Sequence, residues 1–167
     1  MRRPSSTLFS SRPARQQGAA VIEFALILTL LISMMAGIFE FGRAFWYYDA
    51  LTKATRDGAR LMSVSDKDTI ASVAVGTAQT LVANAVTAAG VPGFAVGNVA
   101  VTCLNGLNAA YSDSACTDGT APGGVRVQIV GYNLLIGQFI PFLIGASSSY
   151  TATLSPHTTM RYMPDLL

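Results

Sequence analysis

The chain has 167 residues, enough for one modest domain with an appendage. Charged residues make up 12% of it, whereas about 25% is usual for soluble domains, and 51% is hydrophobic. The formal charge of +2, without a basic face interleaved with aromatic residues, argues against binding to nucleic acid.

A basic segment, residues 1–18, begins the chain and is followed by an apolar one. The charged residues of the basic segment are all arginines: Arg2, Arg3, Arg12 and Arg15. Residues 19–39 form an apolar run long enough to cross a hydrocarbon core of about 30 Å. A cleaved secretory signal has a shorter apolar region of about 7–15 residues and a small-residue cleavage site. The longer run favours an uncleaved transmembrane helix, and the arginines place the N-terminus in the cytoplasm.

Glu23 is the single charged residue of the apolar run. Because an acid inside a membrane helix is costly, two interpretations stay open. The side chain either reaches the headgroups from a shallow position or meets a positive partner. A cut between Gly18 and Ala19 would create such a partner, an α-amine four residues before Glu23. In an assembly, the amine of one subunit would then be neutralised by Glu23 of its neighbour.

The helical pattern continues beyond the span, over residues 40–64, without a proline. Oppositely charged residues three or four apart support this extension, each pair by about 0.2–0.5 kcal/mol; examples are Glu40 with Arg43 and Asp49 with Lys53. An aromatic group at residues 46–48 lies where the outer membrane interface is expected.

Small side chains recur at every fourth position of the span. They are Ala25, Thr29, Ser33 and Gly37. Such a stripe lets two helices approach closely in lipid, although chance also produces one because small residues are common in spans.

The sequence QQGAAVIEF at residues 16–24 resembles the processing site of type IV prepilins. Gly18 precedes the cut, Ala19 follows it, and Glu23 with Phe24 occupies the fifth and sixth positions after it. The stretch behind the span resembles TadE-like pseudopilins of tight-adherence (Flp) pilus systems. The matching residues are Gly37, Glu40, Phe41, Gly42, Arg43, Ala44, Ala50, Leu51, Ala54, Arg56, Gly58, Ala59 and Arg60.

This resemblance covers about residues 16–62 and implies a role in a pilus system. It implies cleavage by a membrane-embedded prepilin peptidase on the cytoplasmic side. The expected product is a minor pilin-like component that helps to assemble a pilus used in cell adhesion. Its expected partners are other pilin-like and pilus-assembly subunits and the lipid bilayer. The expected location is the bacterial inner membrane, with the C-terminal domain in the periplasm.

The remaining sequence predicts one helix and several strands. The helix covers about residues 66–89, with a capping box at Ser65 and Asp68 and a stop at Gly90. Its core face is expected to include Ile70, Val73, Ala74, Ala78, Leu81, Ala85 and Ala89. Period-two alternation predicts strands at 99–103, 125–129 and 150–154.

These elements predict an α+β fold in which a long N-terminal transmembrane helix continues into a small extracytoplasmic domain. The second helix is expected to pack on a short antiparallel sheet. The expected division is a leader at 1–18, a transmembrane helix at 19–39, a projecting helix at 40–64 and a domain at 65–167. An apolar segment at 134–146 is too short to span, and is either buried or facing the membrane or a partner subunit.

Cys103 and Cys116 are the only cysteines and flank a polar loop. Outside the cytoplasm a disulfide is expected. In the chain-entropy model, closing a loop of about 14 residues stabilises the folded state by about 3 kcal/mol. Metal binding or a catalytic cysteine would need further groups, and the sole histidine, His157, has no suitable neighbours in sequence. No metal and no cofactor are therefore expected.

Two functional classes remain: an assembly component, and a ligand-binding domain or enzyme merely anchored to the membrane without cleavage. An enzyme would show clustered titratable groups, and residues beyond 70 contain few of them. The sequence therefore predicts no enzymatic activity. An adhesive domain would share the same architecture and stays open as an alternative.

Overall fold

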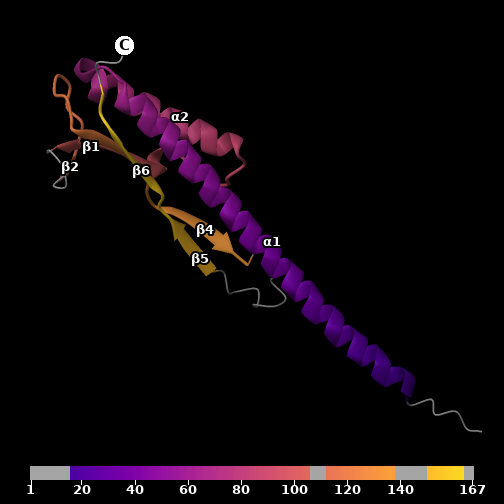
Figure 1. Cartoon of the computed structure of the whole chain (residues 1–167). Helices are drawn as coiled ribbons and strands as arrows, with labels where there is room; N and C mark the ends of the chain where they lie inside the picture. The colour runs from indigo at the N-terminus through magenta and orange to yellow at the C-terminus, as the bar shows by residue number, and fades with distance from the viewer. Residues whose placement is uncertain (1–15, 106–111, 138–149, 164–167) are drawn as a thin grey trace, which may run out of the picture.

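The computed structural model of the chain describes residues 16–105, 112–137 and 150–163 (Figure 1). Its longest element is α1, a single helix of 48 residues over Gln16–Ser63. At about 1.5 Å per residue this helix extends about 72 Å, more than twice the thickness of a hydrocarbon core. No proline interrupts its backbone hydrogen bonds. The expected continuous helix is confirmed, although it begins slightly before residue 19.

The turn after α1 corrects the predicted capping box. The Ser65 hydroxyl donates to the carbonyl of Met62 at 2.9 Å, so it satisfies the end of α1 and does not cap the next helix. Asp66 is the N-cap instead, because its carboxylate accepts the backbone N–H of Asp68 at 2.9 Å. The prediction was one residue too early because Ser65 and Asp66 are both good caps, and only the path of the chain chooses between them.

The second helical segment changes type along its length. A 3-10 turn at Lys67–Thr69 and a π-helical turn at Ile70–Ala74 come before α2, which covers Val75–Ala88. Gly90, with φ of 74°, ends the segment as predicted.

The π-helical turn also changes which face of this segment is buried. Val73 is 57% exposed, although the helical pattern assigned it to the core, and Val82 and Val86, which the pattern did not assign there, are fully buried. Ala85 and Ala89 are partly buried and pack against the core, as predicted. A π-helical turn has more than 3.6 residues, so it rotates the side chains that follow it.

Four strands form an antiparallel sheet in the order β2-β1-β3-β6. Their bounds are Val99–Asn105 for β1, Ser112–Ser114 for β2, Gly124–Ile129 for β3 and His157–Arg161 for β6. Two further strands, β4 at Tyr132–Ile136 and β5 at Tyr150–Leu154, pair antiparallel with each other. The predicted strands correspond to β1, β3 and β5, whereas β2, β4 and β6 were not predicted.

The strands β4 and β5 continue the β3–β6 ribbon through a bulge. Each ribbon is a pair of strands, β3 with β6 and β4 with β5. The connection from β3 to β4 has three residues between the paired positions (129–131), whereas the connection from β5 to β6 has two (155 and 156). The extra residue is accommodated at Gly131, whose φ is 65°, a conformation that favours glycine. The bulge bends the ribbon, and Figure 1 shows β4 and β5 running on beside α1 towards its N-terminal half.

The core lies between the two helices and the sheet. It combines Leu51 and Met62 of α1, Val82 of α2, and Val125 and Val127 of β3, which are all fully buried. A 3-10 turn at Val96–Asn98 leads from α2 into the sheet. Because α1 and α2 cover the sheet as one layer, the α+β fold expected from the sequence is confirmed.

The apolar segment 134–146 is described only in part. Residues 134–136 belong to β4, where Leu134 is buried and Leu135 is 40% exposed. Residues 138–146 lie outside the described part of the chain, so the prediction for them remains a prediction.

Candidate functional site: the N-terminal helix

The N-terminal half of α1 leaves its apolar side chains uncovered. Between residues 21 and 39, the large hydrophobic side chains are from 42% (Leu28) to 74% (Leu30) exposed. Burying apolar surface stabilises by about 25 cal/mol per Å², and soluble monomers rarely expose patches of this extent. The helix contains a window apolar and long enough to cross a membrane. This segment therefore requires lipid or protein around it.

Residues Lys67–Ala88 meet the same criteria of length and hydropathy. In this segment, however, Ala78, Val82 and Val86 are buried in the core of the domain. Its apolar face is already covered by protein, so α1 is the element that needs a further apolar environment.

Polar groups within the apolar half of α1 are satisfied locally. The hydroxyls of Thr29 and Ser33 donate to the carbonyls four residues earlier, each at 2.7 Å. In lipid a hydroxyl without a partner is costly, and these bonds remove that cost. The predicted small-residue stripe therefore presents no unsatisfied donor to a neighbouring helix.

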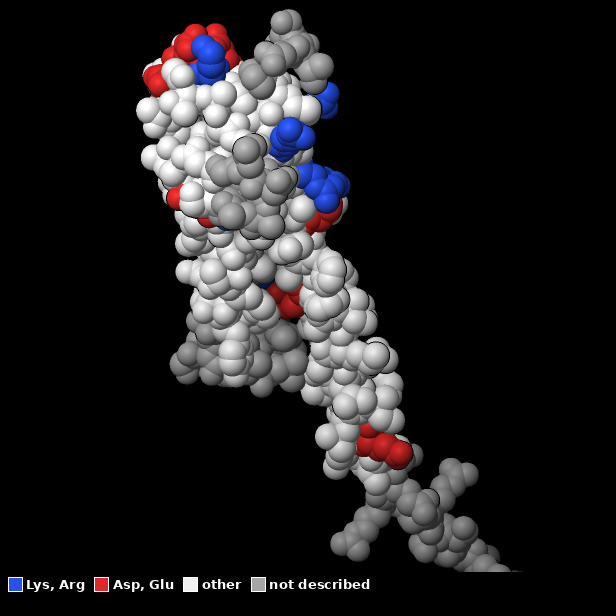
Figure 2. Space-filling model, turned by 60° about the vertical axis from the view of Figure 1, so that its left-hand side comes forward, with Lys and Arg blue, Asp and Glu red and all other residues white. Residues whose placement is uncertain are grey.

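Glu23 is the exception in this half of the helix. Figure 2 shows an acidic side chain on the otherwise uncharged lower part of the helix, and Glu23 is the one charged residue between positions 18 and 39. Glu23 is exposed, and among the described residues it has no ion-pair partner. Its carboxylate is thus available to a group supplied from elsewhere.

Gly18 and Ala19 lie in the first turn of α1 and are exposed. A Cβ added at Gly18 would meet nothing within 4 Å, so the fold does not require glycine there. The first turn of a helix lacks part of its backbone hydrogen bonds, and it unwinds at lower cost than the interior. The peptide bond between Gly18 and Ala19 is therefore placed where a protease can reach it.

The residues of the stretch 37–60, which resembles TadE-like pseudopilins, are divided between two faces of α1. One face packs into the domain, with Leu51, Ala54, Gly58 and Ala59 buried and Ala44 and Ala50 partly buried. The other face is exposed and has Gly37, Phe41, Gly42, Arg56 and Arg60.

The glycines show this division clearly. A Cβ at Gly58 would lie 2.6 Å from Cγ2 of Val82, so glycine is needed for α1 to approach α2. At Gly37 and Gly42 a Cβ would meet nothing within 4 Å. A glycine inside a helix costs about 0.5–1 kcal/mol relative to alanine, and the described chain offers no packing reason for these two.

Glu40 and Arg43 connect the helix to the domain just beyond the apolar run. The side chain of Glu40 is 5% exposed and pairs with Arg43 at 2.6 Å, which confirms the predicted pair. The same nitrogen of Arg43 also donates to the backbone carbonyl of Leu135 on β4, at 2.9 Å. The guanidinium lies over the ring of Tyr47, 5.9 Å from its centroid. Arg43 therefore fixes β4 against α1.

Aromatic side chains surround this junction. The hydroxyl of Tyr132 donates to the carbonyl of Pro92 at 3.1 Å, and burial raises the pKa of its phenol above the ordinary value. On the neighbouring surface Trp46 is 63% exposed, and its indole N–H donates to the carbonyl of Ala89 at 3.2 Å. Phe41 and Phe45 are exposed with ring centroids 4.7 Å apart.

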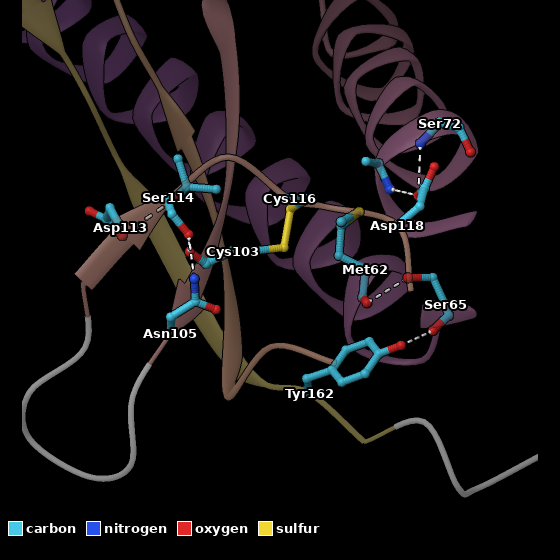
Figure 3. Close-up of a disulfide and its surroundings, with 12 residues drawn as sticks. Met62, Ser65, Ser72, Cys103, Asn105, Asp113, Ser114, Cys116, Asp118 and Tyr162 are labelled. Carbon is cyan, nitrogen blue, oxygen red and sulfur yellow. Dashed lines mark hydrogen bonds between the residues drawn. A yellow bond between two sulfur atoms is a disulfide. The ribbon is translucent and has the colours of Figure 1, made fainter. Parts of the chain in front are cut away.

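The far end of the domain is closed by a disulfide between Cys103 and Cys116 (Figure 3), as predicted. The loop that follows Cys116 folds back on the second helical segment. There the carboxylate of Asp118 accepts the backbone N–H groups of Ala71 and Ser72, at 2.7 and 3.2 Å. Tyr162 completes this end by donating to the carbonyl of Ser65 at 2.6 Å.

The bonds from Ala71 and Ser72 hold the pKa of Asp118 below its ordinary value. A carboxyl group with a depressed folded-state pKa contributes stability above its unfolded pKa of about 4 and loses it as the pH falls through the folded value. Asp118→Asn should therefore lower the Tm by a few degrees at pH 7. The difference from the wild type should shrink as the pH falls below about 4. Thermal unfolding of the full chain in detergent at both pH values measures this, and a constant difference would contradict it.

Sequence reasoning missed two groups at these places. Asp118 was not recognised as the partner of a helical segment, although its position after the disulfide brings it to the second helical segment. The carbonyl of Leu135 could not be found from the sequence at all, since any residue type supplies one.

The segment 18–60, which lies wholly within α1, matches a family model described as TadE-like protein. This match confirms the resemblance derived from the residues themselves. No curated protein and no solved structure gives a significant match to the chain.

Proposed function

We propose that this chain, whose residues 18–60 are TadE-like, is a minor pilin-like component that acts in assembling a tight-adherence pilus. One observation carries the proposal. The α1 helix has an apolar half that no other part of the described chain covers, continuous with a half that is built into the domain. A subunit of this shape can be held in a membrane or in a helical bundle while its domain stays outside.

The proposed topology is a single pass through the bacterial inner membrane. The basic residues before Gly18 remain in the cytoplasm, and the domain lies in the periplasm. The disulfide supports a periplasmic location of the domain, because disulfides persist in oxidising compartments.

The proposed role is structural and not catalytic. Among the described residues beyond 70, Asp118 caps a helical segment and Arg126 forms an ion pair with Asp113, so these titratable side chains serve the fold. The proposed partners are a prepilin peptidase, which would cut between Gly18 and Ala19, and other pilin-like subunits.

The N-terminal mass of the protein isolated from membranes tests the proposal, with and without a co-expressed prepilin peptidase. We expect a mature chain that begins at Ala19 only when the peptidase is present. Gly18→Phe should abolish the cut, because the bulky side chain would not fit where glycine is accepted. Gly18→Ala should retain some processing and serves as the matched control, because neither side chain meets an atom of the chain within 4 Å at its Cβ.

Either of two other masses would contradict the proposal. A chain that keeps the leader in both cases would favour a signal-anchored ligand-binding or adhesive domain. A cut after the apolar run would indicate an ordinary secreted protein.

A further inference from the structure

The bent ribbon places one end of the domain at the level where α1 leaves the apolar span. Three contacts follow the ribbon along the helix. Just beyond β6, the backbone N–H of Met163 donates to the carbonyl of Ser63 at 2.9 Å, and Thr158 of β6 shares a hydrogen bond with Thr55 at 3.0 Å. The Leu135 carbonyl then accepts from Arg43. As the ribbon proceeds, its partners on α1 move steadily towards the N-terminus.

The height of this contact above the membrane follows from helix geometry. If the hydrocarbon ends at Phe39, Arg43 lies about 6 Å further along α1. The headgroup layer on each side of a bilayer is about 5–7 Å thick. The Leu135 carbonyl therefore lies at the outer part of that layer. The pair of Ile136 and Tyr150 is one residue nearer to the membrane.

The side chains at this end suit a lipid interface. The described residues of β4 and β5 contain no charged group. Tyr150 is 63% exposed and Leu135 is 40% exposed. Tyrosine is enriched at the level of the headgroups, because its ring is apolar and its hydroxyl can reach water. The nearest described charges, Glu40 and Arg43, neutralise each other.

Phe41 is an exposed aromatic residue of α1 at this level. It is 68% exposed and lies about 3 Å beyond Phe39, whereas Phe45, Trp46 and Tyr48 lie about 9–14 Å beyond Phe39, outside the headgroup layer. A bilayer that surrounds the span would therefore meet the span-facing end of β4 and β5 close to the level of Phe41.

We propose that the domain rests on the outer surface of the bilayer through the span-facing end of the paired strands β4 and β5, at Ile136 and Tyr150, with Tyr150 among the lipid headgroups. This proposal rests on the membrane topology of the proposed function. The paired strands β4 and β5 and the exposed ring of Phe41 form one membrane-contact surface, defined by Phe41, Leu135, Ile136 and Tyr150. The domain is then held at a fixed orientation by two elements instead of swinging on one helix.

Depth-dependent quenching of tryptophan fluorescence tests the proposal. Trp46 is the only tryptophan, so Trp46→Phe gives a background in which single tryptophans are introduced. The test variant is Tyr150→Trp. The matched control is Val64→Trp, at an exposed position just past the end of α1 and about 30 Å from Arg43 along the helix axis. A third variant, Leu31→Trp, reports on the span. All are studied as the full chain in phosphatidylcholine vesicles.

We expect a nitroxide on the lipid headgroup to quench Tyr150→Trp at least about twofold more than Val64→Trp, because the two differ in distance from the bilayer. Lipids brominated deep in their acyl chains should quench Leu31→Trp. If Leu31→Trp is quenched and Tyr150→Trp behaves like Val64→Trp, the surface contact is wrong and the span stands. Acrylamide, a quencher dissolved in the water, then shows whether the introduced tryptophan at position 150 faces water or is covered by a second copy of the chain. Either outcome overturns the proposed membrane contact. If Leu31→Trp is not quenched, the transmembrane premise and the contact both fail.

Discussion

Arg43→Met should destabilise the domain by about 3 kcal/mol, because it leaves the carboxylate of Glu40 buried without its main cation. The side chain of Glu40 is 5% exposed and that of Arg43 is 19% exposed, so we expect the lower end of the range for breaking a buried ion pair. The variant also removes the donor to Leu135, which fixes β4 against α1. Urea unfolding of the full chain in a mild detergent measures the loss.

The same helix provides a matched control for this prediction. Asp49 and Lys53 form an ion pair at 2.7 Å, but their side chains are 59% and 70% exposed. Lys53→Met should change the free energy of unfolding by less than about 1 kcal/mol, since solvent screens exposed pairs. The double variant Glu40→Leu with Arg43→Met should recover much of the loss, because no charge is then buried. Equal effects of Arg43→Met and Lys53→Met would contradict the assigned role of the pair.

Glu23→Ala should leave membrane insertion intact and reduce the number of assembled pili by about tenfold or more, as expected for the loss of an ion pair within lipid. The reason is that the α-amine created by the proposed cut would have no carboxylate to neutralise it. Membrane fractionation measures insertion, and electron microscopy of the cells measures pili.

The conservative variant Glu23→Gln separates charge from shape. If neutralisation of an amine is the role of Glu23, glutamine should fail as alanine does, whereas Glu23→Asp should retain part of the assembly. Normal numbers of pili in Glu23→Ala cells would exclude the pairing with an amine. They would leave the shallow position near the headgroups as the remaining explanation for this residue.

Much of α1 was predictable, because its features are local. An apolar run, the lack of proline, and charges three or four residues apart act within one helix and need no other part of the chain. The same holds for β1, β3 and β5, whose alternating residues indicate a half-buried strand.

The wrong predictions concern features that neighbouring residues in the sequence do not determine. The cap moved from Ser65 to Asp66 because the end of α1 uses the Ser65 hydroxyl. Val73 turned outward because a π-helical turn rotates the second helical segment. The strand β6 has hardly any apolar residues at alternate positions, and it exists because β3 offers it an open edge.

The sequence by itself determined that this protein has one long apolar helix and a stretch at residues 16–24 that resembles a prepilin processing site. Both depend on composition and spacing, which hold whatever the rest of the chain does. The disulfide between Cys103 and Cys116 was predicted from the expected compartment, and the fold brings the two cysteines together. Only the tertiary structure decided that Gly58 is required by Val82, that Asp118 caps a distant helical segment, and that Arg43 binds the carbonyl of Leu135. Those contacts join residues far apart in the chain, and a backbone carbonyl or a close approach leaves no mark in the residue types around it.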